Sequence, residues 1–450
     1  MNIVNRREFL SMAAGGAAAS IMGLSRTFGA VDKTAAKPNI VIYIADDQYL
    51  ASIGCYGANP SHTPNIDEFA KQGLLFTSTY SNSAICTPNR AVLLSGLYPV
   101  KNGAHPNHSG FKPGIRSMPN YMRDLGYRTA LVGKDGIKFK NALYKWDAYI
   151  EKTNEQVPGA NEPQHERHKK TDYSAIETFI NEDRSKPFCL IHAASLPHSP
   201  SLNALPNGLS GYDASNFYCD YEFGRDLALL ERLGLDKNTL VIYVNDNEAQ
   251  IPRSKYSLYD TGIHVPMIIR WPEQIKAGST TDAMVSFLDI LPTLIEAGGG
   301  KPPENLDGKS FLGVLQGKTQ QHNHEIYFSY TGVIVSENKW QTVPYPSRAI
   351  RTRRFKYIRN LNYTVPHPVL KGKKGDDGMR PYEELYDLAN DPKELNNFVG
   401  AEEFQMVKME LSSKIDAWMK QVDDRGIEGE KGALTYFDPK KRAKWSKLKP

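Results

Sequence analysis

The chain has 450 residues, which is enough for roughly two to three domains or for one large α/β domain with an appendage. Hydrophobic residues make up 40% and charged residues 23% of the sequence, and this composition excludes wholesale disorder. The formal net charge of +5 is too small to indicate binding of nucleic acid. The 4 cysteines are too few for a disulfide scaffold and their spacing fits no zinc site, so a cysteine is available for chemistry.

Residues 1–36 have the pattern of an export signal. Paired arginines in Asn5–Leu10 precede a mildly apolar, Ala- and Gly-rich stretch, Ser11–Ser25, which is too short to span a bilayer. This pattern is typical of a twin-arginine signal peptide, and cleavage after Ala36 fits better than cleavage after Ala30. We therefore predict a periplasmic or secreted protein without a transmembrane segment. An ordinary amphipathic N-terminal helix is the alternative.

The segment after the signal opens with a predicted buried strand, because Pro38–Asp47 is a continuous apolar run that ends in acids. Such runs are typical of parallel strands that are covered on both faces. Helical stretches alternate with further apolar runs, which predicts an α/β fold with a doubly wound, largely parallel sheet. The other predicted strands are Thr129–Val132, Phe188–Ala193, Thr239–Val244 and Met267–Arg270, and the predicted helices are Asn65–Gln72, Arg90–Ser95, Met118–Leu125 and Tyr221–Leu233.

The composition shifts after residue 320, so we predict a catalytic domain over residues 37–320 and a smaller C-terminal α+β subdomain over residues 321–450. Arg348–Leu361 and Glu383–Leu388 have the pattern of antiparallel strands, and Glu402–Val422 has that of a covering helix. We expect a surface loop at 371–378. The tail 440–449 holds six basic residues and no acid. Together with the basic strand that begins at Arg348, the tail favours a polyanionic glycan as partner, and a merely solvated tail is the alternative.

Acidic and amide side chains follow two of the predicted strands. Asp46 and Asp47 end the first strand, and Asp246 and Asn247 come directly after Thr239–Val244. Ligands of doubly wound sheets bind beyond the carboxyl ends of the strands, and hard oxygen donors suit Ca²⁺ or Mg²⁺. Each pair alone has a local explanation, as a helix cap or a turn. Two pairs at the ends of two buried strands favour a metal site.

A second group of residues surrounds Cys86, in the sequence Cys86-Thr87-Pro88-Asn89-Arg90. Pro88 is suited to the first turn of a helix, which would leave Cys86 at a helix N-terminus. The partial positive charge there lowers the pKa of a thiol. A buried structural cysteine is the alternative.

The pattern Cys-x-Pro-x-Arg, followed by a helix and Ser95-Gly96, resembles the signature of the type I sulfatases. The resemblance extends over residues 38–400. It includes Gly133-Lys134, Pro197-His198, the segment Lys255–Pro266, and Glu384–Leu388 with Asp391-Pro392. Pro346–Ala349 and Ile358–Asn362 are most similar to the heparan N-sulfatase (sulfamidase) branch. The resemblance implies an alkaline-phosphatase-like fold and an enzyme that hydrolyses sulfate esters or N-sulfo groups of a sulfated oligo- or polysaccharide.

In this family the cysteine is oxidised to formylglycine by a formylglycine-generating enzyme, and the resemblance assigns this modification to Cys86. A hydrated aldehyde has two hydroxyl groups, so one can attack sulfur and the other can then expel sulfate. The resemblance also implies Ca²⁺, with Mg²⁺ the less favoured ion, bound by Asp46, Asp47, Asp246, Asn247 and the modified Cys86. Cys86 is the implied nucleophile, Arg90 would hold the hydrated aldehyde, and Asp246 would be the base partner. Lys134 and Lys255 would neutralise sulfate, and His198 would protonate the leaving group. Without the resemblance, both lysines are ordinary surface residues and His198 is a loop histidine.

The chain departs from the family pattern at three positions. Gly136 stands where the family has a histidine that assists breakdown of the sulfated intermediate, Glu248 replaces a glycine, and His264 replaces an arginine. The loss of this histidine either makes the enzyme slow, so that sulfated enzyme accumulates, or is compensated by another group. A glycine at 136 leaves room for such a group, so we expect His105 or His108 to take the place of the missing histidine. His105, His108 and His264 are candidate substrate-binding residues.

Two other functions compete with the sulfatase hypothesis. A non-catalytic or weakly active glycan-binding relative would explain Gly136, but it has no need of the intact Cys86 motif. A phosphoester or phosphonate hydrolase on the same fold is disfavoured because the expected extra His and Asp ligands of a second metal are not visible in the sequence. The sequence leaves open the sugar, the sulfate position, O- versus N-sulfate, exo versus endo action and the oligomeric state.

Overall fold

We describe a computed structural model of the chain, which covers residues 37–137, 141–160, 165–331, 345–364 and 378–433. The predicted signal segment 1–36, most of the predicted loop 371–378 and the basic tail 440–449 lie outside these described residues. Across the described ranges, none of the helices is both long and apolar enough to cross a membrane.

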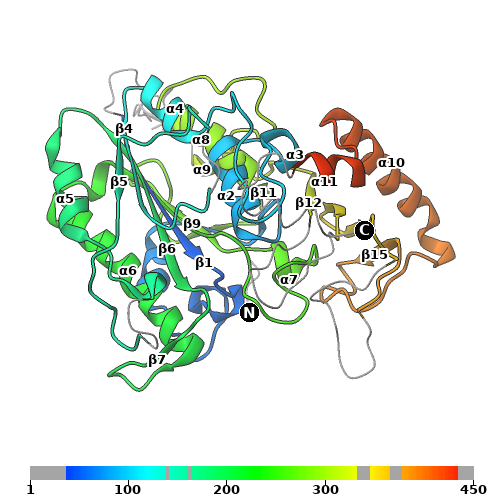
Figure 1. Cartoon of the computed structure of the whole chain (residues 1–450), viewed down its shortest axis with the longest axis horizontal. Coiled ribbons are helices and arrows are strands. Elements are labelled where there is room, and N and C mark those ends of the chain that lie inside the picture. The colour runs from blue at the N-terminus through cyan, green and yellow to red at the C-terminus, as the bar shows by residue number, and fades with distance from the viewer. Residues whose placement is uncertain (1–36, 138–140, 161–164, 332–344, 365–377, 434–450) are drawn as a thin grey trace, which may run out of the picture. The chain divides into compact units, whose positions relative to one another are not determined.

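Eight strands of the described chain form one sheet, which is parallel except around one strand (Figure 1). The central strand β1 (Asn39–Asp46) pairs in parallel with β6 and β8, and β9 runs antiparallel to both β8 and β2. The order across the sheet is β10 (Ser279–Thr281), β2 (Leu74–Phe76), β9 (Met267–Arg270), β8 (Thr239–Asn245), β1, β6 (Phe188–Pro197), β4 (Arg128–Gly133) and β5 (Ala148–Ile150). The predicted doubly wound, largely parallel sheet is confirmed.

Side chains of β1 alternate between two hydrophobic cores, one on each face of the sheet. Ile40, Ile42 and Ile44 lie in one core, and Val41 and Tyr43 lie in the other. The first core is covered by α2 (Cys86–Ser95), α4 (Met118–Asp124) and α8 (Ile290–Ala297), and the second by α1 (Pro64–Gln72), α5 (Tyr173–Glu182) and α6 (Gly211–Arg232). Because both faces are buried, the strand is apolar at every position of its interior, as the sequence indicated.

Helix α6 begins at Gly211, well before the predicted start at Tyr221. Several polar side chains of its first turns are buried, and they hold other parts of the chain. Asn216 accepts a hydrogen bond from Gln48, and the Asp220 carboxylate accepts the backbone N–H of Ile66 at the start of α1. Buried polar residues interrupt the regular spacing of apolar residues from which a helix is predicted, so the start of this helix was missed.

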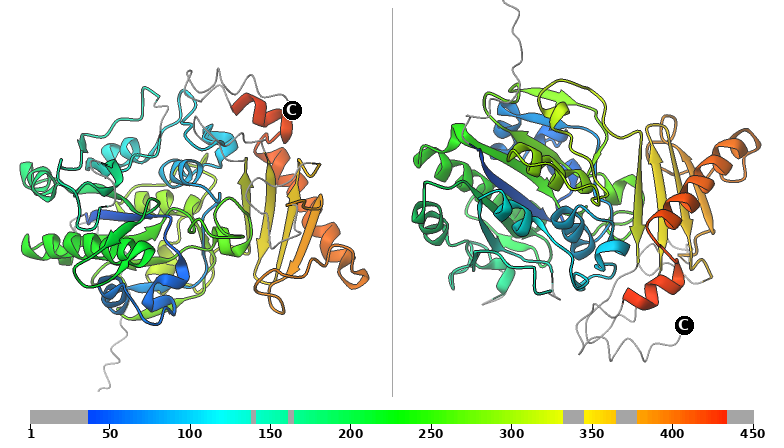
Figure 2. Two further views of the ribbon diagram at one scale, coloured as in Figure 1. Left: turned by 60° about the horizontal axis from the view of Figure 1, so that its bottom comes forward. Right: turned by 90° about the horizontal axis from the view of Figure 1, so that it is seen from above.

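The C-terminal part contains four antiparallel strands in the described residues, and α10 lies along one face of this sheet (Figure 2). These elements are β12 (Glu325–Tyr330), β13 (Ser347–Thr352), β14 (Phe355–Asn360), β15 (Glu383–Asp387) and α10 (Gln405–Gln421). Leu411 and Ile415 of α10 pack on Ile350 and Tyr357 of the sheet. The predicted strands and covering helix are confirmed, whereas the domain boundary at residue 320 stays a prediction. The remaining short elements are β3 (Thr79–Tyr80), β7 (Leu202–Ala204), β11 (Val285–Ser286), α3 (Pro99–Asn102), α7 (Asp260–Ile263), α9 (Leu312–Leu315) and α11 (Ile427–Ala433).

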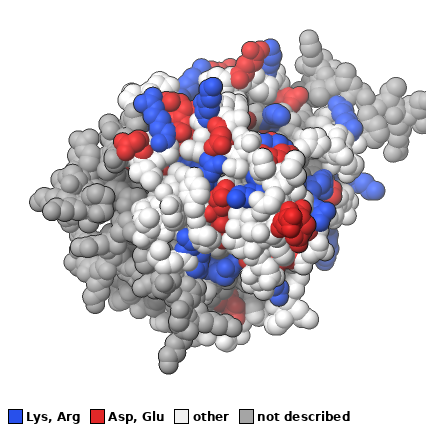
Figure 3. Space-filling view, turned by 90° about the vertical axis from the view of Figure 1, so that its right-hand side faces the viewer, with Lys and Arg blue, Asp and Glu red and all other residues white. Residues whose placement is uncertain are grey.

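The arginines of β13 and β14 are paired within the protein. Arg348 is fully buried and donates to the carboxylates of Asp424 and Glu430, while Arg359 pairs with Asp416. These two arginines therefore do not form the surface for a polyanionic glycan that the basic strand predicts. On the face seen in Figure 3, basic and acidic side chains of the described residues are interspersed.

Arg348→Ala should lower the free energy of unfolding by about 3–5 kcal/mol, because it leaves two carboxylates buried without their cation. The matched control is Arg353→Ala, since Arg353 and its partner Asp282 are 49% and 65% exposed and such surface ion pairs add little to stability. Denaturant unfolding of both variants checks this difference. Equal losses in the two variants would show that the Arg348 network does not brace the C-terminal sheet.

Candidate active site

The ends of β1 and β8 bring three carboxylates into one place, since Ala45 and Asn245 are register partners in neighbouring parallel strands. Consecutive residues of a strand point to opposite faces. Asp47 leaves the strand conformation with a φ of 61°, in the left-handed region, and this turn lets its side chain join that of Asp46. The Asp47 N–H donates to Asp246 Oδ1 at 3.2 Å. Asp46, Asp47 and Asp246 are all buried.

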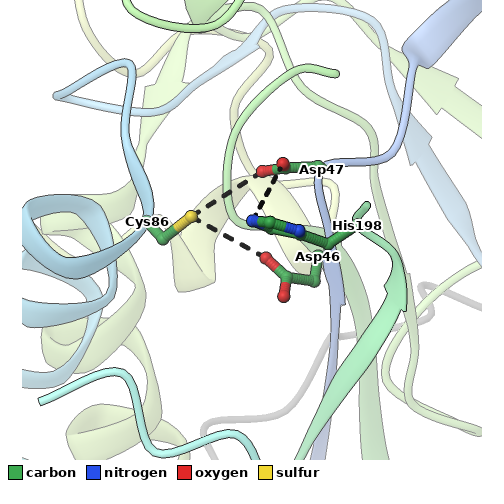
Figure 4. A group of neighbouring side chains, drawn as sticks. All are labelled: Asp46, Asp47, Cys86 and His198. Atoms are coloured by element: carbon green, nitrogen blue, oxygen red, sulfur yellow. Dashed lines mark hydrogen bonds and ion pairs between the residues drawn. The ribbon is translucent and has the colours of Figure 1, made fainter. Parts of the chain in front are cut away.

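Cys86, the first residue of α2, faces the carboxylates that end β1 (Figure 4). Its Sγ lies 3.7 Å from Asp46 Oδ1 and 3.7 Å from Asp47 Oδ1. Lys255 Nζ is 3.4 Å from the same sulfur. One ligand atom from each of Asp46, Asp47, Cys86 and His198 lies within 4.8 Å of the others, so these side chains could share one metal ion.

Each carboxylate has its own cation. Lys134 Nζ donates to both oxygens of Asp46 and Lys255 Nζ to both oxygens of Asp47, all at 2.6 Å. Arg90 Nε donates to Asp246 Oδ2 at 2.8 Å. The structure thus brings together the predicted site residues Asp46, Asp47, Cys86, Arg90, Lys134, His198, Asp246, Asn247 and Lys255.

The pKa values of the site reflect burial and these ion pairs. Burial alone raises the pKa of Asp46, but the charges of Lys134, His198 and Arg90 outweigh it and hold that pKa well below its usual value. For Asp246 burial prevails and raises the pKa. Burial also raises the pKa of the Cys86 thiol to about 12. The expected lowering by the helix N-terminus is therefore outweighed, and the unmodified thiol stays protonated.

Tight backbone contacts position Lys134 and Lys255. Gly133 ends β4 with a φ of 79°, and a Cβ there would lie 2.4 Å from the Ala193 carbonyl oxygen of β6, so a glycine is required just before Lys134. On the other side, the Tyr256 N–H donates to the Ala84 carbonyl oxygen at 2.9 Å. This bond fixes the position of Lys255 relative to the chain that leads into Cys86.

His198 follows the end of β6 and faces the same carboxylates. Its Nδ1 lies 2.6 Å from the Ser199 carbonyl oxygen, an acceptor, so Nδ1 carries a proton. Nε2 lies 3.4 Å from Asp47 Oδ2 and is protonated only in the imidazolium form. Burial lowers the pKa of His198, while the Asp47 and Asp46 carboxylates act in the opposite direction.

The space beside Gly136 is not vacant, contrary to our expectation. Gly136 has a φ of 77°, and a Cβ at this position would lie 2.6 Å from Arg90 Cδ. Arg90 therefore occupies the volume that a side chain at position 136 would need. The Gly136 carbonyl oxygen accepts a hydrogen bond from Thr87 Oγ1 at 2.8 Å, which fixes the glycine against the first turn of α2.

The three candidate histidines have different surroundings. The His108 N–H donates to Thr87 Oγ1 at 3.1 Å, so His108 lies beside the first turn of α2. His105 is buried, and its Nδ1 is 3.8 Å from Glu430 Oε2 in the Arg348 network. His264 bonds the Thr77 carbonyl oxygen at 2.9 Å and stacks on Tyr80. The contacts of His105 and His264 are thus with residues outside the Cys86 cluster.

Two features of the site were not predicted. Arg167, in the short 3₁₀ helix Glu166–His168, donates from Nη1 to Asp46 Oδ2 at 3.3 Å. The sequence gives no signal of this contact, because only the tertiary structure brings Arg167 to Asp46. Glu248 is buried and accepts the Leu50 N–H at 3.0 Å, so this departure from the family pattern has a structural partner.

The donor atoms fit a hard divalent cation. Three carboxylates converge here, and Asn247 Oδ1 is buried without a hydrogen-bond donor among the described residues. The Asn247 amide nitrogen donates to Asp47 Oδ1 at 2.8 Å, so the amide is held beside the carboxylates. An all-oxygen set of this kind suits Ca²⁺ or Mg²⁺.

Cys86 is surrounded by carboxylates and cations beyond the strand ends of a doubly wound sheet, and the fold is alkaline-phosphatase-like. The sulfatase family model matches residues 38–300, and the model of the C-terminal region of N-sulphoglucosamine sulphohydrolase matches residues 254–421. The chain belongs to the sulfatase family and is a sulfuric ester hydrolase.

Several relatives share most of the chain. An ulvan-active sulfatase of Formosa agariphila is 35% identical over 423 residues, covering 86% of this chain and 81% of that protein. Human N-sulphoglucosamine sulphohydrolase is 25% identical, covering 88% and 92% of the two chains. A solved structure of a protein in complex with its substrate D-glucosamine-2-N,6-O-disulfate is similar to this structure. The TM-score is 0.69 at 22% sequence identity, and the match covers 87% of this chain and 99% of that chain.

Gly136→Ala should lower kcat at least about tenfold, because the new Cβ displaces Arg90 from its bond to Asp246. Gly114→Ala is the matched control, since Gly114 has a similar φ of 80° but nothing within 4 Å of a new Cβ. Both variants should lose about 1 kcal/mol of stability from the strained backbone. Gly136→Ala should lose more than Gly114→Ala, because it also disturbs the buried pair of Arg90 with Asp246, and only Gly136→Ala should lose activity. Thermal unfolding and steady-state kinetics separate the two effects. Full activity in Gly136→Ala would mean that Arg90 does not depend on this close contact.

Proposed function

We propose that the protein removes sulfate from a sulfated oligo- or polysaccharide, cleaving sulfate esters or N-sulfo groups, through a formylglycine derived from Cys86 and with one bound Ca²⁺. The observation that carries the proposal is the position of Cys86 Sγ, 3.7 Å from two carboxylates and 3.4 Å from Lys255 Nζ. The relatives support the substrate class, because they include an ulvan-active sulfatase and a structure with a disulfated glucosamine.

The Ca²⁺ would be held by Asp46, Asp47, Asp246 and Asn247, together with the modified Cys86. When bound, the ion and the hydrated formylglycine supply a charge that offsets sulfate and a pair of hydroxyl groups for attack and release. Calcium suits a site that already has three carboxylates, since it accepts six to eight oxygen ligands in flexible geometry.

The residues around Cys86 orient the reaction and stabilise charge. Arg90 holds the carboxylate of Asp246, which is placed to accept the proton of the attacking group. Lys134 and Lys255 provide positive charge on two sides of the sulfate, which stabilises negative charge as the bond to the leaving oxygen breaks. His198, in its imidazolium form, donates the proton from Nε2 to the leaving group.

A phosphonate monoester hydrolase of Agrobacterium radiobacter has the same fold, with a TM-score of 0.66 at 19% identity over 86% of this chain and 96% of that chain. That similarity concerns the fold alone. Among the described residues, the His/Cys/Asp/Glu cluster that could hold a metal is the one at Asp46, Asp47, Cys86 and His198, which favours a site with a single ion. A non-catalytic glycan-binding role does not explain why a cysteine is surrounded by paired carboxylates and lysines.

The route to the mature protein is part of the proposal. Residues 1–36 would act as a twin-arginine signal and direct the folded protein to the periplasm or outside the cell. A formylglycine-generating enzyme would convert Cys86 before export. The catalytic α/β part over residues 37–320 and the α+β subdomain over residues 321–450 would then work as one enzyme.

The peptide that contains Cys86 should be about 18 Da lighter than its sequence mass in protein coexpressed with a maturating enzyme, as conversion of thiol to aldehyde requires. Such protein should release sulfate from a sulfated glycan, and Cys86→Ala should not. Cys189→Ala is the control and should still release sulfate, because Cys189 lies in the hydrophobic core. Turnover by protein whose Cys86 is entirely unmodified would refute the formylglycine proposal.

His198→Ala should lower kcat/KM for a sulfated sugar about a hundredfold or more, and much less for an aryl sulfate such as 4-nitrophenyl sulfate. A sugar alkoxide needs a proton as it leaves, whereas a nitrophenolate leaves without one. Comparing both substrates in wild type and variant isolates this proton transfer. An equal loss on the two substrates would assign His198 to binding rather than to proton donation.

A further inference from the structure

We propose that Arg167 binds a second anionic group, a carboxylate or another sulfate, on the sugar that carries the scissile sulfate, and that it thereby selects the substrate. This inference rests on the proposed function, because it concerns the same site. It adds a specificity-determining residue that lies outside the cysteine motif.

Arg167 lies on the side of Asp46 that is turned away from the nucleophile. Cys86 Sγ and Arg90 Nη2 approach Asp46 Oδ1, at 3.7 Å each, whereas Arg167 Nη1 contacts Oδ2 at 3.3 Å. Lys134 Nζ bridges both oxygens at 2.6 Å. An anion on the sulfur side therefore meets Cys86 and Arg90, and one on the other side meets Arg167.

The charge of Arg167 is not needed to neutralise Asp46. Lys134 already makes two short bonds to this carboxylate, and Arg90 adds a second cation within 3.7 Å. A guanidinium has five N–H donors, and within the described residues Arg167 uses one of its side-chain donors, on Asp46. The remaining donors suit the planar, bidentate recognition of a carboxylate or of two sulfate oxygens.

Exposure indicates where the rest of the substrate lies. The side chains of Arg90 and Lys255 are only 3% and 1% exposed, whereas those of Arg167, Lys134 and His198 are 30%, 20% and 18% exposed. The cluster therefore opens to solvent on the side of these three residues. A sugar attached to the scissile sulfate leaves the site along this side and passes Arg167.

The backbone around Arg167 is held in place before any substrate binds. His168 is buried, its carbonyl oxygen accepts the Val157 N–H at 2.7 Å, and its Nε2 lies 2.8 Å from the Pro200 carbonyl oxygen. The next anchor is the Lys170 N–H, which donates to the Glu155 carbonyl oxygen at 2.9 Å. The segment is thus tied to the loop after His198. Such preorganisation lowers the entropy cost of binding.

The test compares matured wild type, Arg167→Gln and Arg167→Lys on two pairs of substrates. One pair is a sulfated disaccharide with a uronate carboxylate and its carboxyl-reduced counterpart, and the other is a disulfated and a monosulfated amino sugar. The control is Lys170→Gln, which removes the same charge from the same segment where Lys170 pairs with Glu155. Calorimetric affinities of the same sugars are measured alongside kcat/KM.

Wild type should prefer the more anionic member of at least one pair. Arg167→Gln should reduce that preference about tenfold to a hundredfold, the effect of losing one charge-assisted contact. Arg167→Lys should retain part of it, and Lys170→Gln all of it. The pair that responds identifies the group as carboxylate or sulfate.

Equal losses on both members of each pair in Arg167→Gln, or no preference in wild type, would overturn the proposal. Failure of the proposed function would look different, because wild type would then release no sulfate from any of the four sugars. In that case the affinity ratios still decide the role of Arg167. An unchanged ratio in Arg167→Gln rejects it.

Discussion

Three carboxylates buried at the ends of two neighbouring strands must be compensated by positive charge, and the site is organised around this constraint. Asp46 ends β1, Asp47 follows it and Asp246 follows β8, so the parallel pairing of these strands brings the three carboxylates together. Without partners, such buried charges would protonate or unfold the strand ends. In the proposed function, the compensating cations bind sulfate and the carboxylates bind a metal ion. The same side chains would then serve both electrostatic balance and catalysis.

The cations come from separate parts of the chain, and each part is anchored independently. Lys134 depends on the tight end of β4 at Gly133, whereas Lys255 lies in the long connection between β8 and β9. This connection continues into Asp260, which pairs with Arg351 at 3.0 Å and with Lys356 of the C-terminal sheet. The C-terminal strands therefore brace the loop that carries Lys255. This contact gives the C-terminal sheet a role in the site.

The sequence was sufficient wherever one strand or one motif carries the information. The apolar run of β1 and the acids that follow it identified the sheet and the edge at which the candidate site lies, and the Cys86 motif identified the cysteine of that site. Features that depend on tertiary contacts were not predicted from the sequence. Arg348 has the same sequence signal as a surface arginine, yet two distant carboxylates neutralise it. Arg167 reaches Asp46 only through the fold, and Gly136 seemed to leave a space that Arg90 fills.

The most direct test of this account is a calorimetric titration of Ca²⁺ into the chelator-treated, matured full chain. One ion per chain should bind, and Asp46→Asn should abolish this binding, since it removes a charged ligand from the centre of the cluster. Asp282→Asn should bind like wild type, because Asp282 is 65% exposed and pairs with Arg353 at the surface. No calcium binding by the wild type, or equal binding by wild type and Asp46→Asn, would contradict the claim that the buried carboxylates form a metal centre.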